Sequence, residues 1–370
     1  TEEVSWENER YFEEYSRTRI HASMLGDTRR NEAYAAALKP GTVRDKVVLD
    51  VGCGTGILSM LCARNGAKRV YAVEASDMVE RARTVFVMNG LADRIVLLHG
   101  RVEEVDLPEQ VDILVSEWMG VLLLFEGMAH SVLNARDRFL KPGGLILPTM
   151  ATIFAAPVTM PTQVRDNIDV FRSVGGFDLS ALVPKATYEY CAQALKSRNI
   201  PWSDVRGPPQ QLLYLDLRTA TSQDLREFVV RLDLPVVEDG RGVHGVGCFF
   251  EVTFSSDDRP CPPQVVVDSV DGELVVRKKD KSGRSEAVDP DAPYYHNAQG
   301  DIVFSTSPWF KETHFGQDIF LFESLVSLQP TRGPITGVVR VTENEHWKRH
   351  YNVIFDIQME NHVLSKEFAL

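Results

Sequence analysis

An apolar run that passes directly into a glycine-rich turn constrains the fold of this chain more than any other segment. Val47 to Val51 is predicted to be a buried strand, and three glycines, Gly52, Gly54 and Gly56, follow it before a second apolar segment begins. A strand, a glycine-rich turn and a helix in this order are typical of the first unit of a parallel α/β sheet that binds a ligand at the turn.

The residues of this turn indicate the class of ligand. A dinucleotide places its pyrophosphate at the turn and the following helix N-terminus, where the dipole favours negative charge, and a carboxylate at Asp50 would oppose it. The glycines also follow the order G-x-G-x-G instead of the dinucleotide order G-x-G-x-x-G. The better fit is a cofactor without phosphate and with a cationic centre, as in S-adenosylmethionine.

Three more acids follow predicted strands. Glu74 ends the apolar run 70–73, Glu103 follows the run 95–98, and Glu117 follows the run 111–115. Ligands bind at the carboxyl ends of parallel strands, so we expect these acids to lie near the glycine turn. For each acid alone, a solvated loop carboxylate is the simpler interpretation.

The pattern along the chain changes near Pro148. Residues 1–39 are largely helical by spacing, and residues 40–148 alternate short apolar strands with helical windows, which predicts a Rossmann-like domain with its last turn at Lys141-Pro142-Gly143-Gly144. From 149 to 370, strand-like runs bounded by Pro, Gly and Asp favour an antiparallel barrel or sandwich. Its predicted strands are 151–158, 211–217, 228–232, 243–254, 319–328, 335–341 and 353–359.

Two segments interrupt this second domain. A helical window at 178–196 is predicted to leave the sheet, and a polar stretch at about 256–300 contains two apolar runs around Asp271-Gly272, which indicates a hairpin. The basic cluster 277–284 that follows is interpreted as a solvated loop.

Composition narrows the function classes. The 370-residue chain has 40 Lys and Arg against 52 Asp and Glu, a net charge of −12, which argues against direct binding of nucleic acid as its function. Five scattered cysteines form no disulfide framework or metal spacing, so we predict no metal and a reducing compartment. Without a long apolar run or a signal-peptide pattern, the chain is predicted to be soluble and intracellular, cytoplasmic or nuclear, although a trimmed targeting segment stays open because the chain does not start with Met.

Two carboxylates flank an otherwise uncharged loop, Glu117 and Glu126. Two close acids in a dry pocket repel each other unless a cation lies between them, and a planar guanidinium suits both because it donates paired hydrogen bonds. The pair could therefore hold a substrate arginine beside the cofactor. In the alternative interpretation, Glu117 caps the next helix and Glu126 is solvated.

At these residues the chain resembles the protein arginine methyltransferases, and the resemblance covers nearly its whole length. It implies that Glu117 and Glu126 clamp the target arginine, that Asp50, Gly52, Gly54 and Gly56 belong to the cofactor loop, that Glu74 binds ribose, and that Glu103 with Val102 contacts adenine. The implied fold is a Rossmann-like S-adenosylmethionine domain followed by an antiparallel β-barrel with an inserted helical arm.

The N-terminal segment resembles the family helices that close over the cofactor. The motif Tyr11-Phe12-x-x-Tyr15, followed by His21, Met24, Asp27 and Arg30, carries this similarity. It implies that Phe12, Tyr15 and His21 contact the cofactor and that Arg30 binds its carboxylate. Without the rest of the pattern, an amphipathic surface helix would explain these residues.

In the second domain, Thr313-His314-Phe315 resembles a motif of the family that usually reads Thr-His-Trp. The resemblance implies that His314 borders the arginine pocket and pairs with Asp27. The segment Glu345-His346-Trp347 has the expected Trp, but its neighbouring sequence fits the family motif less well, so we treat it as a decoy. Phe315, in place of the usual Trp, keeps an aromatic ring at the wall of the pocket, but this ring extends less far.

The resemblance also implies a product and partners. Met24 and Met128, with Trp118 in the substrate pocket, resemble members that make monomethyl and asymmetric dimethylarginine on protein substrates such as histones or RNA-binding proteins. The segment of about 176–206 is assigned to an arm that forms a homodimer. A catalytically silent scaffold and a small-molecule methyltransferase are the alternatives; the paired acids argue against both.

Overall fold

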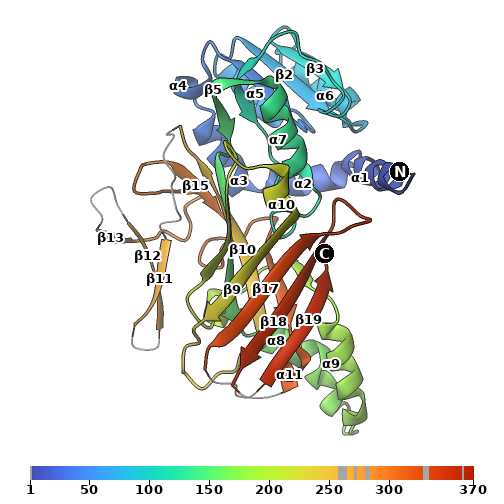
Figure 1. The fold of residues 1–370 in the computed structure, drawn as a ribbon, viewed down its shortest axis with the longest axis vertical. Coiled ribbons are helices and arrows are strands. Elements are labelled where there is room, and N and C mark those ends of the chain that lie inside the picture. The colour runs from blue at the N-terminus through green and yellow to red at the C-terminus, as the bar shows by residue number, and fades with distance from the viewer. Residues whose placement is uncertain (1, 257–264, 271–272, 280–283, 328–332, 361) are drawn as a thin grey trace.

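The chain folds into two stacked parts joined near residue 148 (Figure 1). The computed structural model describes residues 2–256, 265–270, 273–279, 284–327, 333–360 and 362–370. One part is built on a parallel sheet, and the other on antiparallel strands. The α/β prediction and the antiparallel second domain are confirmed.

The parallel sheet has the strand order β3-β2-β1-β4-β5. Every residue of the central strand β1 is buried, as expected for a strand covered on both faces by helices. The strands are β1 (Val47–Val51), β2 (Arg69–Glu74), β3 (Ile95–His99), β4 (Val111–Val115) and β5 (Leu140–Leu147), and the helices between them are α5 (Ile57–Arg64), α6 (Met78–Met88) and α7 (Met128–Phe139). This order brings the carboxyl ends of β1, β2, β3 and β4 to one edge.

The predicted turn at 141–144 lies inside β5. The register between β4 and β5 shifts here, because Val111 pairs with Leu140 whereas Ile113 pairs with Leu145. The intervening residues therefore form a bulge, and Gly143 has a φ of 71° there. The prediction of a separate turn was wrong because a proline and two glycines also suit a bulge in a strand.

Four helices precede the sheet. They are α1 (Glu2–Tyr15), α2 (Thr18–Gly26), α3 (Thr28–Ala37) and α4 (Pro40–Val43). Asp27 separates α2 from α3 and caps α3, because its side chain accepts a hydrogen bond from the N–H of Arg30 at 3.0 Å. In Figure 1, α1 extends to one side between the two parts of the molecule.

The described residues of the second part form three antiparallel sheets. The largest includes β6 (Met150–Val158), β7 (Leu195–Arg198), β8 (Gln210–Asp216), β10 (Gly245–Phe254), β14 (Tyr295–His296), β15 (Ile302–Ser305) and β16 (Gln317–Leu321). The second contains β9 (Glu227–Leu234), β17 (Ile335–Glu343), β18 (Tyr351–Met359) and β19 (His362–Ala369), and the third contains β11 (Val265–Val270), β12 (Glu273–Lys279) and β13 (Ser285–Ala287). Short helix α10 (Ser222–Arg226) precedes β9.

The two predicted interruptions are present. The segment between β6 and β7 carries α8 (Pro161–Asn167), three-residue and four-residue 3₁₀ turns and α9 (Val183–Cys191), and it projects from the body in Figure 1. A further 3₁₀ turn, Trp202–Asp204, precedes β8. The hairpin is confirmed by the antiparallel pairing of β11 with β12, whereas its turn, Asp271-Gly272, lies outside the described residues.

Two other predictions need correction. The run 319–328 is not one strand, because β16 ends at Leu321 and α11 (Glu323–Ser327) follows, while residue 328 lies outside the described residues. Short apolar runs do not distinguish strand from helix by periodicity. The basic cluster also begins within β12, since Arg277 pairs with Val266 and Ala287; residues 280–283 lie outside the described residues.

Four cysteines, Cys53, Cys62, Cys191 and Cys248, are unpaired and buried; Cys261 lies outside the described residues. Across the described part of the chain, no helix combines the length and apolar character needed to span a bilayer.

Candidate active site

A cavity of about 250 Å³ lies where the parallel sheet, α1, α2 and the barrel meet. Its lining includes fifteen of the eighteen residues that the sequence predicted: Phe12, Tyr15, His21, Met24, Arg30, Gly52, Gly54, Glu74, Val102, Glu103, Glu117, Trp118, Glu126, Met128 and His314. Asp27, Asp50 and Gly56 are outside this lining. Segments from all parts of the chain thus converge on one space.

The glycine turn lets side chains of two neighbouring helices lie close to it. Gly54 has a φ of 54°, and a Cβ there would lie 3.1 Å from Cε1 of His21. Gly56, with a φ of 83°, has another role, because a Cβ there would lie 2.1 Å from Cε1 of Phe86. Gly54 therefore lets His21 of α2 lie close to the turn, and Gly56 lets α6 pack against the turn.

Asp50 lies behind the cavity wall. Its side chain is fully buried and accepts a 2.6 Å hydrogen bond from the Ser59 hydroxyl of α5. Burial raises the pKa of Asp50 to about 7. This placement does not support the predicted direct contact between Asp50 and a ligand, and it gives the residue a role in joining β1 to α5.

Glu74 and Glu103 define one end of the cavity. Both oxygens of the Glu74 carboxylate accept backbone hydrogen bonds, from Gly54 at 2.7 Å and from Ser76 at 2.8 Å. The Glu103 carboxylate accepts a 2.6 Å hydrogen bond from Ser131. Each carboxylate oxygen has a further lone pair, so both acids can still accept hydroxyl or amino hydrogen atoms from a ligand.

Glu117 is held by an arginine from α3. Its Oε2 lies 3.0 Å from Nη1 of Arg30, and both side chains are largely buried. Arg30 also donates through Nε and Nη2 to Asn31, which leaves other N–H groups of the guanidinium for a ligand. Glu117 is thereby fixed in orientation at the cavity wall.

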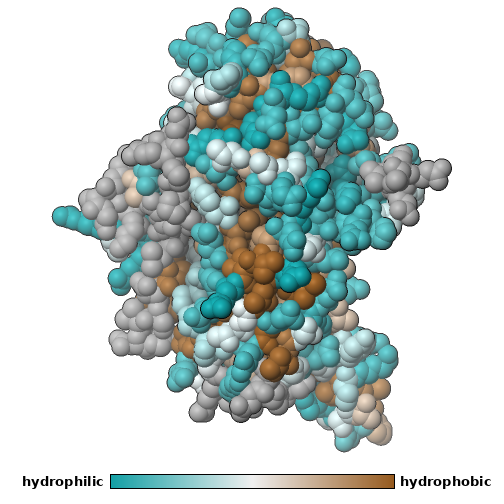
Figure 2. Space-filling view, in the orientation of Figure 1, coloured by the Kyte–Doolittle hydropathy of each residue, from teal (hydrophilic) through white to brown (hydrophobic). Residues whose placement is uncertain are grey.

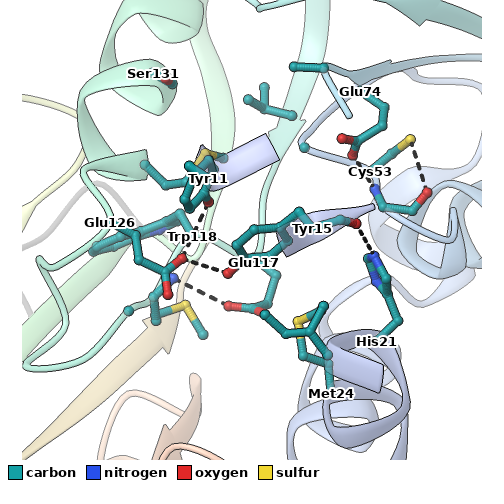
Figure 3. Close-up of a pocket in the computed structure, with 18 of the residues that line it drawn as sticks. Tyr11, Tyr15, His21, Met24, Cys53, Glu74, Glu117, Trp118, Glu126 and Ser131 are labelled. Carbon is teal, nitrogen blue, oxygen red and sulfur yellow. Dashed lines mark hydrogen bonds between the residues drawn. The ribbon is translucent and has the colours of Figure 1, made fainter. Parts of the chain in front are cut away.

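Glu126 has an unusual backbone and two hydroxyl partners. Its φ is 82°, a conformation that costs a residue other than glycine about 1–2 kcal/mol. Its Oε2 accepts hydrogen bonds from the hydroxyls of Tyr15 at 2.5 Å and Tyr11 at 3.3 Å. Figure 3 shows both tyrosines pointing at Glu126, with Glu117 beside them and Glu74 on the opposite side of the cavity.

Burial raises the pKa of Glu126, and the negative charge of Glu117 acts in the same direction. The hydrogen bonds from Tyr15 and Tyr11 and the charge of Arg349 oppose this rise in pKa. Burial also raises the pKa of both tyrosines, so their hydroxyls stay protonated as donors. A cation placed between the two acids would stabilise both carboxylates.

Asp27 and His314 join the two parts of the molecule. Nδ1 of His314 lies 2.7 Å from Oδ2 of Asp27, and the backbone N–H of His314 donates to the same oxygen at 3.0 Å. Burial alone would raise the pKa of Asp27, but the hydrogen bonds from His314 and Arg30 outweigh it and lower that pKa. The predicted pairing of these two residues is confirmed.

Comparison with known proteins decides the family. A rice protein, "Probable protein arginine N-methyltransferase 6.1", is 37% identical over 97% of this chain and 88% of its own length. Human "Protein arginine N-methyltransferase 2" is 34% identical over 95% of this chain and 72% of its own length. This chain belongs to the protein arginine N-methyltransferase family. It is an S-adenosylmethionine-dependent enzyme of that family.

Family models and solved structures agree with this assignment. Residues 48–144 match a methyltransferase domain, and residues 149–267 match the arginine methyltransferase oligomerization subdomain. The Arabidopsis thaliana protein arginine methyltransferase 10 has a TM-score of 0.74 and 27% identity over 97% of this chain and 99% of its own. The Trypanosoma brucei PRMT1 enzyme-prozyme complex with AdoHcy has the same TM-score, with 26% identity over 96% and 99% of the two chains.

The cavity suits the methyltransferase cofactor. Gly52 and Gly54 have no Cβ to block a close approach to the turn, and the acids Glu74, Glu103 and Glu117 surround a space for a ligand with a cationic centre. Among the described residues, no group of three or more His, Cys, Asp or Glu side chains could hold a metal ion.

Several lining residues of this methyltransferase were not assigned from its sequence. Arg349, Asp318 and Ser131 all line the cavity, and none lies in a motif with a recognisable spacing. Tyr11 belonged to a motif but had no assigned role. The decoy Trp347 is outside this lining and packs against Trp6, with ring centroids 5.4 Å apart.

Proposed function

We propose that Glu117 and Glu126 bind the guanidinium of the target arginine between them. The observation that carries the proposal is that both carboxylates, from one loop, line the same cavity, while a raised pKa at Glu126 reflects a buried acid beside another acid. A guanidinium donates paired hydrogen bonds to a carboxylate and remains charged, so it would relieve this repulsion.

The two acids would orient the arginine and distribute its charge. Bound S-adenosylmethionine supplies an electrophilic methyl group on its sulfonium. Holding the guanidinium between two fixed carboxylates draws positive charge toward one side and leaves electron density on the nitrogen that faces the methyl. Positioning of this kind contributes on the order of 7 kcal/mol in favourable cases.

Other lining residues would hold the cofactor. Glu74 would accept the ribose hydroxyls, Glu103 with Val102 would contact the adenine, and Arg30 would use its remaining N–H groups for the carboxylate. Phe12, Tyr15 and His21 would cover the cofactor from the N-terminal helices. His21 is itself fixed, since its Nε2 lies 2.8 Å from the carbonyl oxygen of Tyr15.

The expected product is asymmetric dimethylarginine, formed through the monomethyl form. Met24, Met128 and Trp118 line the cavity beside the two acids and would shape the space around the methylated nitrogen. The protein should be incubated with labelled cofactor and an arginine-rich peptide, and the product fragmented in a mass spectrometer. Absence of transfer despite cofactor binding would support the scaffold alternative, and a symmetric product would contradict the product assignment.

We further propose that the segment of about 176–206 mediates a homodimer. It falls within the region that matches the oligomerization subdomain, and it exposes apolar side chains, including 73% of Phe177, 46% of Leu182 and 64% of Tyr188. Figure 2 shows apolar surface on this projecting segment. Phe177→Asp should halve the mass measured by light scattering; a mass unchanged from the wild-type dimer, or a wild-type monomer, would contradict the proposal.

A further inference from the structure

A loop of the barrel contacts both Glu126 and helix α1. The loop, residues 344–350, connects β17 to β18, and Arg349 is its residue that lines the active-site cavity. The loop resembles a functional motif only at Glu345-His346-Trp347, which does not line the cavity, and Arg349 is 223 residues from Glu126 in the sequence.

Arg349 holds the backbone of Glu126 from both sides. The N–H of Glu126 donates to the carbonyl oxygen of Arg349 at 2.7 Å, and Nη1 of Arg349 donates to the carbonyl oxygen of Glu126 at 2.5 Å. These bonds act on a residue with a φ of 82°, which residues other than glycine rarely adopt. The carboxylate of Glu126 therefore points into the cavity from a backbone that Arg349 fixes.

The same arginine holds α1. Its guanidinium lies 3.8 Å from the ring centroid of Tyr11, and its Nε and Nη2 donate to the Asn8 side chain at 3.0 and 2.8 Å. The buried carboxylate of Glu7 accepts hydrogen bonds from the backbone N–H groups of Arg349, at 2.9 Å, and Lys348, at 3.0 Å. Helix α1 is thus joined to the barrel loop by several directional contacts.

Helix α1 completes the set of contacts through Tyr15 and Tyr11, whose hydroxyls bind the Glu126 carboxylate. Arg349 and α1 therefore hold opposite parts of the same glutamate. A displaced α1 would remove both hydroxyl donors from Glu126 and the partners of the Arg349 guanidinium at once.

We infer that Arg349 is a positioning residue that couples the docking of α1 to the geometry of Glu126. The arginine pocket is complete only while α1 lies against the loop 344–350. This inference rests on the proposed role of Glu126. According to this inference, α1 covers the cofactor and Glu126 reaches its binding position in one conformational event.

The test compares five variants of the full chain, one of which, Arg349→Ala, serves only for the pH dependence. Arg349→Lys keeps the charge but cannot bond Glu126 and Asn8 with the same fork, and Glu7→Gln weakens the α1 contact without touching the cavity. Arg340→Lys, at an exposed position on β17, is the matched control, and Glu126→Gln reports on the proposed function. For each variant we would measure thermal unfolding, cofactor Kd, and kcat and KM for a peptide, with kcat as a function of pH.

Arg349→Lys is expected to lower kcat on the order of 10- to 100-fold per folded molecule, because a small misplacement of a catalytic group has effects of this size. Glu7→Gln is expected to lower kcat several-fold and to weaken cofactor binding. Arg349→Ala should also move the acid limb of the kcat profile to higher pH, since the charge of Arg349 lowers the pKa of Glu126.

The outcomes separate the inference from the proposed function. If Glu126→Gln is inactive while Arg349→Lys and Glu7→Gln match Arg340→Lys, the inference is wrong and the clamp stands. If Glu126→Gln retains wild-type kcat, the clamp fails and the inference with it. Should the Arg349 variants unfold, Glu7→Gln decides, because a loss of kcat at full folding supports the coupling and an unchanged kcat overturns it.

Discussion

The two ends of the cavity are built in different ways. At the cofactor end, Gly54, Glu74 and Glu103 lie within about fifty residues of sequence and follow successive strands of one sheet. At the arginine end, Glu126 depends on Tyr15 from α1 and Arg349 from the barrel, which are 334 positions apart. The first end is set by a local folding unit, and the second exists only when the whole chain is assembled.

This difference predicts which end of the cavity should be affected by mutations far from it. Strand ends are held by a sheet whose central strand is entirely buried, so the cofactor end should tolerate changes in the barrel. The arginine end should respond to changes in α1 and in the loop 344–350. Variants at the two ends should therefore affect different kinetic constants.

Glu126→Gln is expected to have the largest effect. The amide keeps the shape but loses the negative charge that would stabilise the guanidinium, so kcat should fall on the order of 10²- to 10³-fold. Cofactor affinity should stay close to that of the wild type, measured by calorimetry. Glu367→Gln, at an exposed position on β19, is the control, and an equal loss of cofactor binding would contradict the assigned role.

Glu74→Gln should affect the other end. A buried carboxylate that binds hydroxyls contributes about 1.5–3 kcal/mol per charged hydrogen bond, so cofactor Kd should rise roughly 10- to 100-fold. At saturating cofactor, kcat should remain within a few-fold of the wild type. The exposed Glu80→Gln on α6 serves as control; unchanged cofactor affinity in Glu74→Gln would overturn the ribose assignment.

The same division explains what the sequence could predict. Glu74, Glu103 and Glu117 were located because parallel strand ends share an edge, a rule that needs only the order of the elements. The rule does not say which face of β1 a side chain takes, and Asp50 lies on the face of Ser59, outside the cavity lining.

The arginine end was predictable only in part. Glu126 was predicted from its pairing with Glu117 in an otherwise uncharged loop, whereas His314 and Asp27 came from resemblance to family motifs. The contact between Asp27 and His314 is present. Arg349 could not be found, because its contacts depend on how a barrel loop packs against a helix at the other end of the chain. Periodicity and spacing carry no information about such packing.

The acid limb of the pH dependence of turnover should report on the arginine end. Because burial raises the pKa of Glu126 above its ordinary 4.5, kcat should fall as the pH drops through that raised pKa, about tenfold per unit below it. Tyr15→Phe removes a hydrogen bond that lowers this pKa, so the acid limb should move to higher pH. A limb that moves in Glu74→Gln and stays fixed in Tyr15→Phe would show that the titrating group lies at the cofactor end.

Phe315→Trp should give the smallest effect and the finest test of the arginine end. Phe315 lines the cavity and packs against Phe250 and Phe304, with ring centroids 5.1 and 6.0 Å apart. A larger ring at this wall should extend over the mouth of the pocket beside His314 and change contacts with residues that flank the target arginine. We expect kcat/KM to change several-fold, and to different extents, for peptides with glycine and with bulky residues beside the arginine. Cofactor Kd should not change, because Phe315 belongs to the barrel side; identical peptide ratios in the variant and the wild type would exclude this wall from peptide selection.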